Sequence, residues 1–238
     1  VTDEKGATAT QDVVVTLTGT NDAPQINLVE FNGTLREDGT QLLDFLITAR
    51  DIDQGDTLTL SVDGASEYGA YTVSTDGHVI FSQAYNDATR ALAQGEMVVE
   101  SFTASYTDNH NASADYIGYF SLQGVNDAPV ITSSAQAGSV REDSVLSASG
   151  DVTAWDIDHG ASWTFSGSAT GQYGNFTVDP NGHWTYALDN GAAIVQSLAQ
   201  GETKEETFVV TVTDDKEATA TQSVTISIAG SNDARSEE

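Results

Sequence analysis

Apolar side chains alternate with polar ones along most of the chain. Phe208, Val210 and Val212 take every second position in one segment, and Val224 and Ile226 continue the same spacing in the next. A period of two places alternate side chains on one face of a β-strand, so both segments are predicted to be strands with one buried face. About seven short strands per ~100 residues, separated by turns, are typical of an immunoglobulin-like sandwich. The pattern therefore predicts an all-β fold.

Turn signals separate the predicted strands. The sequences DPNG at 179–182 and STDG at 74–77 lie between strand-like runs, where glycine supplies the positive φ that a hairpin turn needs. A single helical turn is predicted within 190–199, ahead of Gly201. The chain is therefore expected to contain almost only strands and turns.

The chain repeats itself at the spacing of a domain. The motif NDAP occurs at 21–24 and 126–129, and a third copy starts at 232–234. Asp22 and Asp127 are 105 residues apart (127 − 22), and Asp127 and Asp233 are 106 apart (233 − 127). Further segments match in the same order, which identifies a tandem repeat. We predict two immunoglobulin-like sandwiches stacked end to end, at 23–128 and 129–238, with 1–22 as the last strand of a truncated upstream repeat.

The apolar face of that first segment has no partner of its own in this sequence. Val13, Val15 and Leu17 align with the strand positions Val224, Ile226 and Ile228. An unpaired strand edge is prone to associate with another sheet. We expect the segment to lie on a neighbouring chain's sheet or to fold back over the first domain.

Charge and composition exclude several classes of partner. Asp and Glu number 36 against 8 Lys and Arg, which gives a formal net charge of −28. Binding to nucleic acid and to anionic membranes depends on basic residues, so neither is expected. No apolar run approaches the roughly 18 residues of a membrane span, so direct membrane insertion is not expected either. The absence of cysteine leaves bound metal ions as the expected cross-links of an extracellular protein.

The acidic residues are predicted to meet where two domains join. In an immunoglobulin-like strand order, one end of repeat two carries two acidic loops and the entering linker, while the facing end of repeat one carries two glutamates. These groups are Asp156, Asp158, Asp214, Asn126, Asp127, Glu37 and Glu96; the corresponding groups at the first junction are Asn21, Asp22, Asp51, Asp53 and Asp108. Crowded carboxylates repel one another unless cations lie among them. An oxygen-only ligand set from loops favours Ca²⁺ over Mg²⁺.

The stretch VTDDKEATATQSVTISIAGSNDA at 212–234 resembles the VCBS and cadherin-like repeats of bacterial RTX-type surface adhesins. The resemblance covers essentially the whole chain. It implies matched calcium ligands in each repeat: an acid after the first strand, an Asp-x-Asp loop, a later glutamate, a closing aspartate and an Asn-Asp linker. Residues of these kinds are Glu37 and Glu142, Asp51/Asp53 and Asp156/Asp158, Glu96 and Glu202, Asp108 and Asp214, Asn21-Asp22 and Asn126-Asp127. The linkers carry Gly19-Thr20 and Gly124-Val125 where cadherins have a further Asp, which favours one or two ions per junction over three.

The resemblance implies a mechanical function. Calcium-rigidified extender repeats of a large adhesin would project a distal binding module from the cell surface, after type I export. Their partners would be neighbouring repeats of the same chain, and a surface or glycan ligand would bind through other domains. The sequence contains no serine–histidine–aspartate order, phosphate-binding glycine loop or zinc-ligand spacing, so no catalytic activity is predicted.

Two other functions fit the same sequence. The repeats could form a glycan- or protein-binding module that uses Tyr68, Tyr71, Tyr173 or Trp184 on exposed hairpins. They could also be an accessory domain of a secreted polysaccharide-degrading enzyme, because repeats of this family occur in such enzymes.

Overall fold

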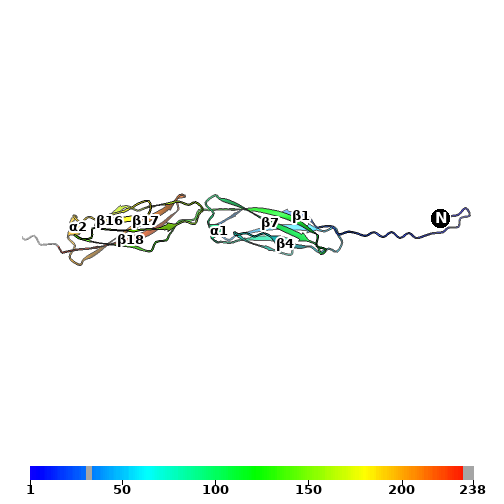
Figure 1. The fold of residues 1–238 in the computed structure, drawn as a ribbon, viewed down its shortest axis with the longest axis horizontal. Coiled ribbons are helices and arrows are strands. Elements are labelled where there is room, and N and C mark those ends of the chain that lie inside the picture. The colour runs from blue at the N-terminus through cyan, green and yellow to red at the C-terminus, as the bar shows by residue number, and fades with distance from the viewer. Residues whose placement is uncertain (31–33, 233–238) are drawn as a thin grey trace, which may run out of the picture.

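The protein consists of two β-sandwiches placed end to end, with an extended segment before the first (Figure 1). The structure is a computed structural model and describes residues 1–30 and 34–232. The predicted all-β fold is confirmed: both domains are sandwiches of antiparallel hairpins, and the described helices are limited to two single turns. Neither of these two turns has the length or apolar character needed to cross a membrane.

The first sandwich has two four-stranded sheets, in the orders β1-β3-β6-β5 and β2-β8-β7-β4. The short β2 runs parallel to the end of β8, and the long β7–β8 hairpin forms the centre of the second sheet. Its elements are β1 (Gln25–Glu30), β2 (Thr34–Arg36), β3 (Leu42–Arg50), β4 (Thr59–Asp63), β5 (Gly69–Val73), β6 (His78–Gln83), α1 (Asp87–Arg90), β7 (Met97–Thr107) and β8 (Ser113–Gln123).

The second sandwich repeats this arrangement. Its main sheets have the orders β10-β18-β17-β13 and β11-β16-β15-β14, and β9 pairs with β12 at the end that faces the first domain. The elements are β9 (Val130–Ile131), β10 (Gln136–Arg141), β11 (Ser147–Asp151), β12 (Ala154–Trp155), β13 (Trp163–Ser166), β14 (Ala169–Thr170), β15 (Gly174–Val178), β16 (His183–Leu188), α2 (Ala193–Gln196), β17 (Thr203–Asp214) and β18 (Thr219–Ala229).

The alternating pattern produces the core of each domain. In β17, Phe208, Val210 and Val212 are buried while Val209, on the opposite face, is 51% exposed. The ring of Phe208 stacks on Phe176 of the facing sheet, with centroids 4.7 Å apart. Each domain encloses its own cluster of buried apolar residues, so each has the means to stay folded by itself.

The aromatic residues of the glycan-binding alternative lie in these cores. Tyr68, Tyr173 and Trp184 are 9%, 8% and 0% exposed, and Tyr71 packs against Phe81. Their hairpins were expected to present them to solvent, and that expectation is wrong. They sit on the inward face of strands or directly before them, where burial of a large ring stabilises the sandwich.

The segment 1–23 lies outside both sandwiches and extends away from the first one (Figure 1). Val13, Val15 and Leu17 are 82%, 76% and 93% exposed. The segment therefore does not fold back over the first domain, and that alternative is wrong. Its packing on a neighbouring chain stays a prediction.

Removal of one core ring is expected to destabilise the second domain alone. Phe208→Ala should lower its free energy of unfolding by about 3–5 kcal/mol, because a stacked, buried ring is replaced by a cavity. Tryptophan fluorescence during urea denaturation reports this domain selectively, because Trp155, Trp163 and Trp184 all belong to it.

Val209→Ala is the matched control, since this side chain projects from the same strand to solvent. It should change the free energy of unfolding by no more than about 0.5 kcal/mol. Equal losses in the two variants would contradict the assignment of faces.

Candidate metal centre

Acidic side chains from both domains meet at the linker between β8 and β9. Glu37 follows β2 of the first domain, Asp156 and Asp158 follow β12 of the second, and Asp127 belongs to the linker. Glu37, Asp156 and Asp158 are 3%, 3% and 7% exposed, which is unusual for carboxylates. The structure thus brings together the groups that the repeat pattern predicted to meet.

Three of these carboxylates form a compact cluster. One oxygen atom each from Glu37, Asp127 and Asp158 lies within 4.8 Å of the others. Backbone groups hold the cluster in place: the Asp127 N–H donates to Asp158 Oδ2 (3.0 Å), and the Asp158 N–H donates to Asp156 Oδ1 (3.1 Å). The Val125 N–H donates to the Glu37 carboxylate. The linker and both domains therefore share one network.

Each buried acid in the network also has one oxygen atom that accepts no hydrogen bond from the described residues. Within residues 1–30 and 34–232, no hydrogen-bond donor reaches Glu37 Oε2, Asp156 Oδ2 or Asp158 Oδ1. A buried, unpaired carboxylate oxygen is costly unless a proton or a cation compensates it. The donor atoms are all oxygens, which suits Ca²⁺ and not softer metals.

The acid–base properties of the cluster reflect this crowding. Burial raises the pKa of Glu37 to about 7, the Val125 N–H opposes the rise, and Asp127 and Asp158 add to it. Burial likewise raises the pKa of Asp158 to about 6, with Asp156 and Asp127 adding to the rise. The pKa of Asp156 is raised by burial too. Near neutral pH the cluster holds several negative charges that repel one another.

Asp214 and Asn126 lock the linker to the second domain. Asp214 Oδ1 accepts from the N–H groups of Lys216 and Ala218, both at 2.8 Å, in the turn between β17 and β18. Asp214 Oδ2 accepts from Asn126 Nδ2 at 2.9 Å. Both oxygens of this predicted ligand thus have partners within the protein, so Asp214 positions the linker.

Glu96 lies at the same junction but outside the cluster. Its carboxylate accepts from the Ala93 N–H (3.0 Å) and lies 3.1 Å from His159 Nδ1 of the second domain. The sequence predicted Glu96 to be a metal ligand and gave no indication of its contact with His159. The structure makes Glu96 part of a direct contact between the domains.

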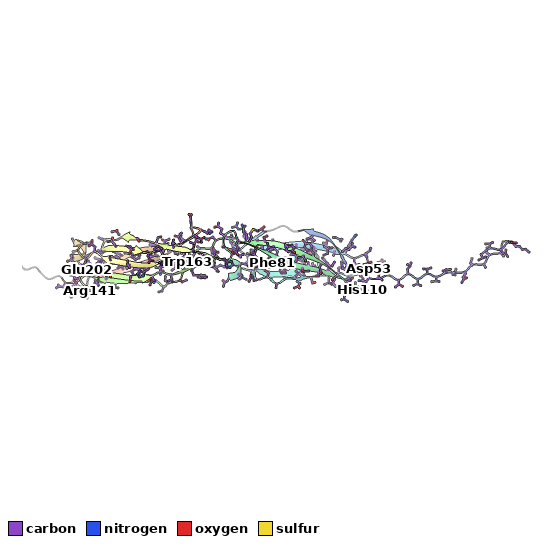
Figure 2. All side chains as sticks on the ribbon, turned by 45° about the horizontal axis from the view of Figure 1, so that its top comes forward. Asp53, Phe81, His110, Arg141, Trp163 and Glu202 are labelled. Carbon is purple, nitrogen blue, oxygen red and sulfur yellow. The ribbon has the colours of Figure 1, made fainter. Side chains whose placement is uncertain are left out.

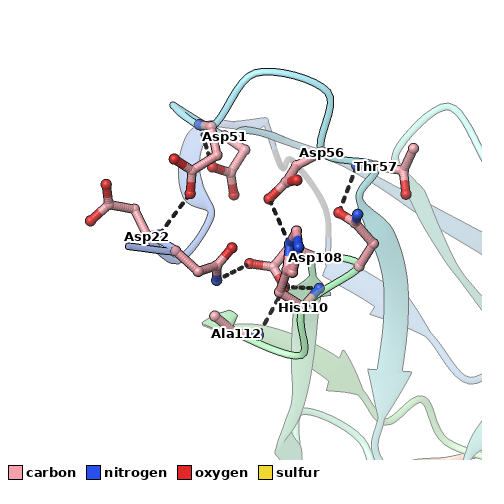
Figure 3. A network of polar contacts seen from close by, with 10 residues as sticks. Asp22, Asp51, Asp56, Thr57, Asp108, His110 and Ala112 are labelled. Atoms are coloured by element: carbon pink, nitrogen blue, oxygen red, sulfur yellow. Dashed lines mark hydrogen bonds and ion pairs between the residues drawn. The ribbon is translucent and has the colours of Figure 1, made fainter. Parts of the chain in front are cut away.

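The first junction repeats these contacts (Figure 3). Asn21 Nδ2 donates to Asp108 Oδ2 at 2.9 Å, and the Asp22 N–H donates to Asp53 Oδ2 at 2.7 Å. The Asp53 N–H donates to Asp51 Oδ1 at 2.9 Å. These contacts correspond one by one to those of the middle linker. Hydrogen bonds to Asp108, the bond from Asn21 above all, lower the pKa of this carboxyl.

Sequence reasoning missed one acid at this junction. Oxygen atoms of Asp51, Asp56 and Asp108 lie within 4.8 Å of one another, and the Asp56 side chain is only 5% exposed. The second repeat has Ala161 at the position of Asp56. Alignment of the two repeats therefore did not identify Asp56 as a candidate metal ligand. The concentration of three acids in DIDQGD at 51–56 was the signal available for it.

The far end of the second domain carries a further buried acid. Figure 2 labels Arg141 and Glu202 at this end, opposite Asp53 and His110. Glu142 is fully buried; the Ser231 N–H donates to its Oε2 at 3.0 Å, and no described residue bonds its Oε1. Glu202 instead pairs with Lys204 at 2.9 Å. The third motif copy at 232–234 lies outside the described residues from Asp233 onward.

Comparisons with known proteins agree with this architecture. Residues 126–230 match the family model of the bacterial cadherin-like domain. Protocadherin gamma B2 extracellular cadherin domains 1–5 superpose with a TM-score of 0.52 at 16% identity, covering 91% of this chain and 41% of that one. Mouse cadherin-23 EC22–24 gives 0.48 at 20% identity, covering 89% and 67%.

The protocadherin gammaB7 EC3–6 cis-dimer structure gives a TM-score of 0.46 at 17% identity, covering 87% of this chain and 50% of that one. The chain thus spans about half the length of the first protocadherin fragments it resembles. No curated protein sequence matches it. At such identities the likeness to solved structures shows the fold alone. The chain is therefore built of cadherin-like β-sandwich repeats, the second of which matches the bacterial cadherin-like domain.

Proposed function

We propose that these repeats are calcium-rigidified extenders of a large bacterial surface adhesin, which hold a distal binding module away from the cell. The observation that supports this most is the group of buried carboxylate oxygens without donors at the middle junction. Those oxygens come from both domains, so whatever compensates them also ties the domains together.

Glu37 of the first repeat, Asp127 of the linker, and Asp156 and Asp158 of the second repeat would hold the ion. Calcium binds 6–8 oxygens and, when bound, neutralises the charge that these groups concentrate. An ion that binds only the aligned domains stabilises that alignment by RT ln(1 + [Ca]/Kd), about 2.7 kcal/mol at a hundredfold excess over Kd. Backbone hydrogen bonds already orient Asp156 and Asp158, so little reorganisation is required.

Features at both ends of the chain support a longer array. Asp3 Oδ1 accepts from the N–H groups of Lys5 (3.0 Å) and Ala7 (2.8 Å), which is the pattern of the Asp108 and Asp214 turns. We infer that 1–22 ends a preceding repeat, that 23–128 and 129–238 are whole repeats, and that Glu142 faces a following junction.

The location proposed is the cell surface, after export by a type I route. Extracellular calcium modules typically have Kd values of about 10⁻⁴–10⁻³ M, so such sites fill outside the cell and stay empty within it. The extender would then become rigid only after export. This step would require no enzyme and no cofactor besides calcium.

Calcium is expected to straighten the molecule. In small-angle scattering, addition of a chelator should reduce the maximum dimension and broaden the distance distribution, because repulsion opens the hinge at 126–129. Neither domain should unfold, since each has its own core. An identical maximum dimension with calcium and with chelator would contradict the proposal.

Loss of one ligand should weaken calcium specifically. Asp156→Asn should raise the calcium Kd of the middle junction at least about tenfold, or about 1.4 kcal/mol. The Asn keeps the acceptor for the Asp158 N–H, so the loop is preserved.

The control is Asp179→Asn. It removes one charge from an exposed turn and likewise keeps the acceptor for the Asn181 and His183 N–H groups. Isothermal titration should show little change for it. Equal losses in both variants would indicate a diffuse counterion cloud in place of a site.

Without calcium, stability should fall as the pH rises from about 5 to about 8. Burial raises the pKa of Glu37 to about 7 and that of Asp158 to about 6, so the folded state binds protons that the unfolded state has released in this window. The melting temperature in chelator should therefore be higher at the lower pH. Calcium should reduce this dependence, because it replaces the protons.

Glu37→Gln should flatten the pH dependence, because the glutamine does not titrate. Asp63→Asn, at an exposed residue of β4 that is not among the charges raising the pKa of Glu37, serves as the control and should leave the dependence intact. The same slope in Glu37→Gln as in the unmodified protein would exclude Glu37 as its source.

A further inference from the structure

One basic side chain of the first domain reaches the linker. The single-turn helix α1 ends at Arg90, which lines a shared hollow with Ala128 and Val130 at the start of the second domain. Asn86 fixes this turn: its Oδ1 accepts from the Thr89 N–H at 3.0 Å, and its N–H donates to Thr89 Oγ1 at 3.0 Å. A capped turn presents Arg90 in a defined direction, so its contacts with the linker follow from the fold.

Arg90 lies between the linker and an exposed tyrosine. Its Nη2 atom is 3.4 Å from Asp127 Oδ2, and its Cζ atom is 5.6 Å from the centroid of the Tyr85 ring. The side chains of Arg90 and Asp127 are only 31% and 32% exposed. Partial burial reduces screening by water, so this pair is stronger than a surface ion pair. The cation–π contact with Tyr85 restricts the guanidinium further.

A second contact joins the domains directly after Arg90. The carbonyl oxygen of Ala91 accepts from the His159 N–H of the second domain at 2.8 Å. The His159 ring lies against Glu96 of the first domain, with Nδ1 3.1 Å from Oε2. Arg90, Ala91 and Glu96 of one domain therefore contact both the linker and the Asp156–Asp158 loop region of the other. None of these bonds needs a metal ion.

We propose that Arg90 and Ala91, with Asp127 and His159 as their partners, form a metal-independent latch that limits, without preventing, the opening of the middle junction before calcium binds. Arg90 is a positioning residue: its fixed positive charge offsets one of the crowded carboxylates and orients Asp127 toward Glu37 and Asp158. The latch acts in the calcium-free protein, so it does not rest on the proposed function.

The second repeat lacks the basic residue of the latch. The segment IVQSLAQGE at 194–202 aligns with ATRALAQGE at 88–96, which places Gln196 at the position of Arg90. Gln196 cannot supply the positive charge. A junction after the second repeat is therefore expected to open more fully than the middle junction when calcium is removed.

The test measures the distance between the domains with two spin labels. The chain has no cysteine, so Ser101→Cys and Thr207→Cys provide exposed, matching label sites on β7 and β17. Pulsed electron paramagnetic resonance is recorded in chelator and in calcium, with and without Arg90→Gln. In chelator, the variant should lower the ratio of latched to open molecules about fivefold, or about 1 kcal/mol. Calcium should restore the narrow distribution.

Lys204→Gln is the charge-matched control, because it also removes one positive charge but pairs with Glu202 within its own domain. It should leave the distribution unchanged. Arg90→Lys keeps the charge but lacks the planar group over Tyr85, so a distance distribution of intermediate width is expected.

If Arg90→Gln has the same distance distribution in chelator as the unmodified protein, the latch is refuted. If calcium fails to narrow even the unmodified protein's distribution, the calcium proposal fails and the latch stands.

Discussion

Repulsion among buried carboxylates at the middle junction is the constraint on which the rest of this structure depends. Glu37, Asp156 and Asp158 are almost fully enclosed, yet each keeps an oxygen without a donor in the described structure. A protein that needed only a stable domain interface would be better served by apolar residues in this place. A cluster of buried carboxylates has a use if a cation from solution compensates its negative charge. Under the proposed function, the relative orientation of the domains would depend on the calcium concentration, while each sandwich would stay folded.

In each domain the core determines the fold, and the loops at the ends carry the acidic residues of the junctions. Apolar alternation in the long hairpins β7–β8 and β17–β18 fixes the sheets, and the sheets fix where the loops emerge. Backbone N–H groups of Asp127 and Asp158 then orient the carboxylates, as those of Asp22 and Asp53 do at the first junction. The fold thus pre-organises the carboxylates that are proposed to bind calcium. Arg90 adds a fixed charge that calcium-dependent contacts alone would not provide.

Much of this architecture follows from the sequence, because strand period and repeat spacing are local and global signals that agree. The places where prediction failed have physical reasons. Alternation cannot tell which face of a hairpin turns inward, so Tyr68 and Trp184 were expected outside. Asp56 has no acidic counterpart in the second repeat, so alignment of the repeats did not identify it. Arg90 lies in a helix of one turn, which is too short to show a periodic pattern. Glu96 was predicted to lie at the junction as a metal ligand, but no local pattern indicated its contact with His159, which lies 63 positions later in the chain.

Anomalous X-ray diffraction from crystals grown with calcium tests the central claim most directly. The account predicts an anomalous peak at the middle junction within about 2.3–2.6 Å of oxygens from Glu37, Asp127 and the Asp156–Asp158 loop. At a calcium concentration close to the Kd of the unmodified protein, the peak should be much weaker in crystals of Asp156→Asn. Aligned domains with no peak among these carboxylates would contradict the account, because the buried oxygens would then be compensated by protons alone.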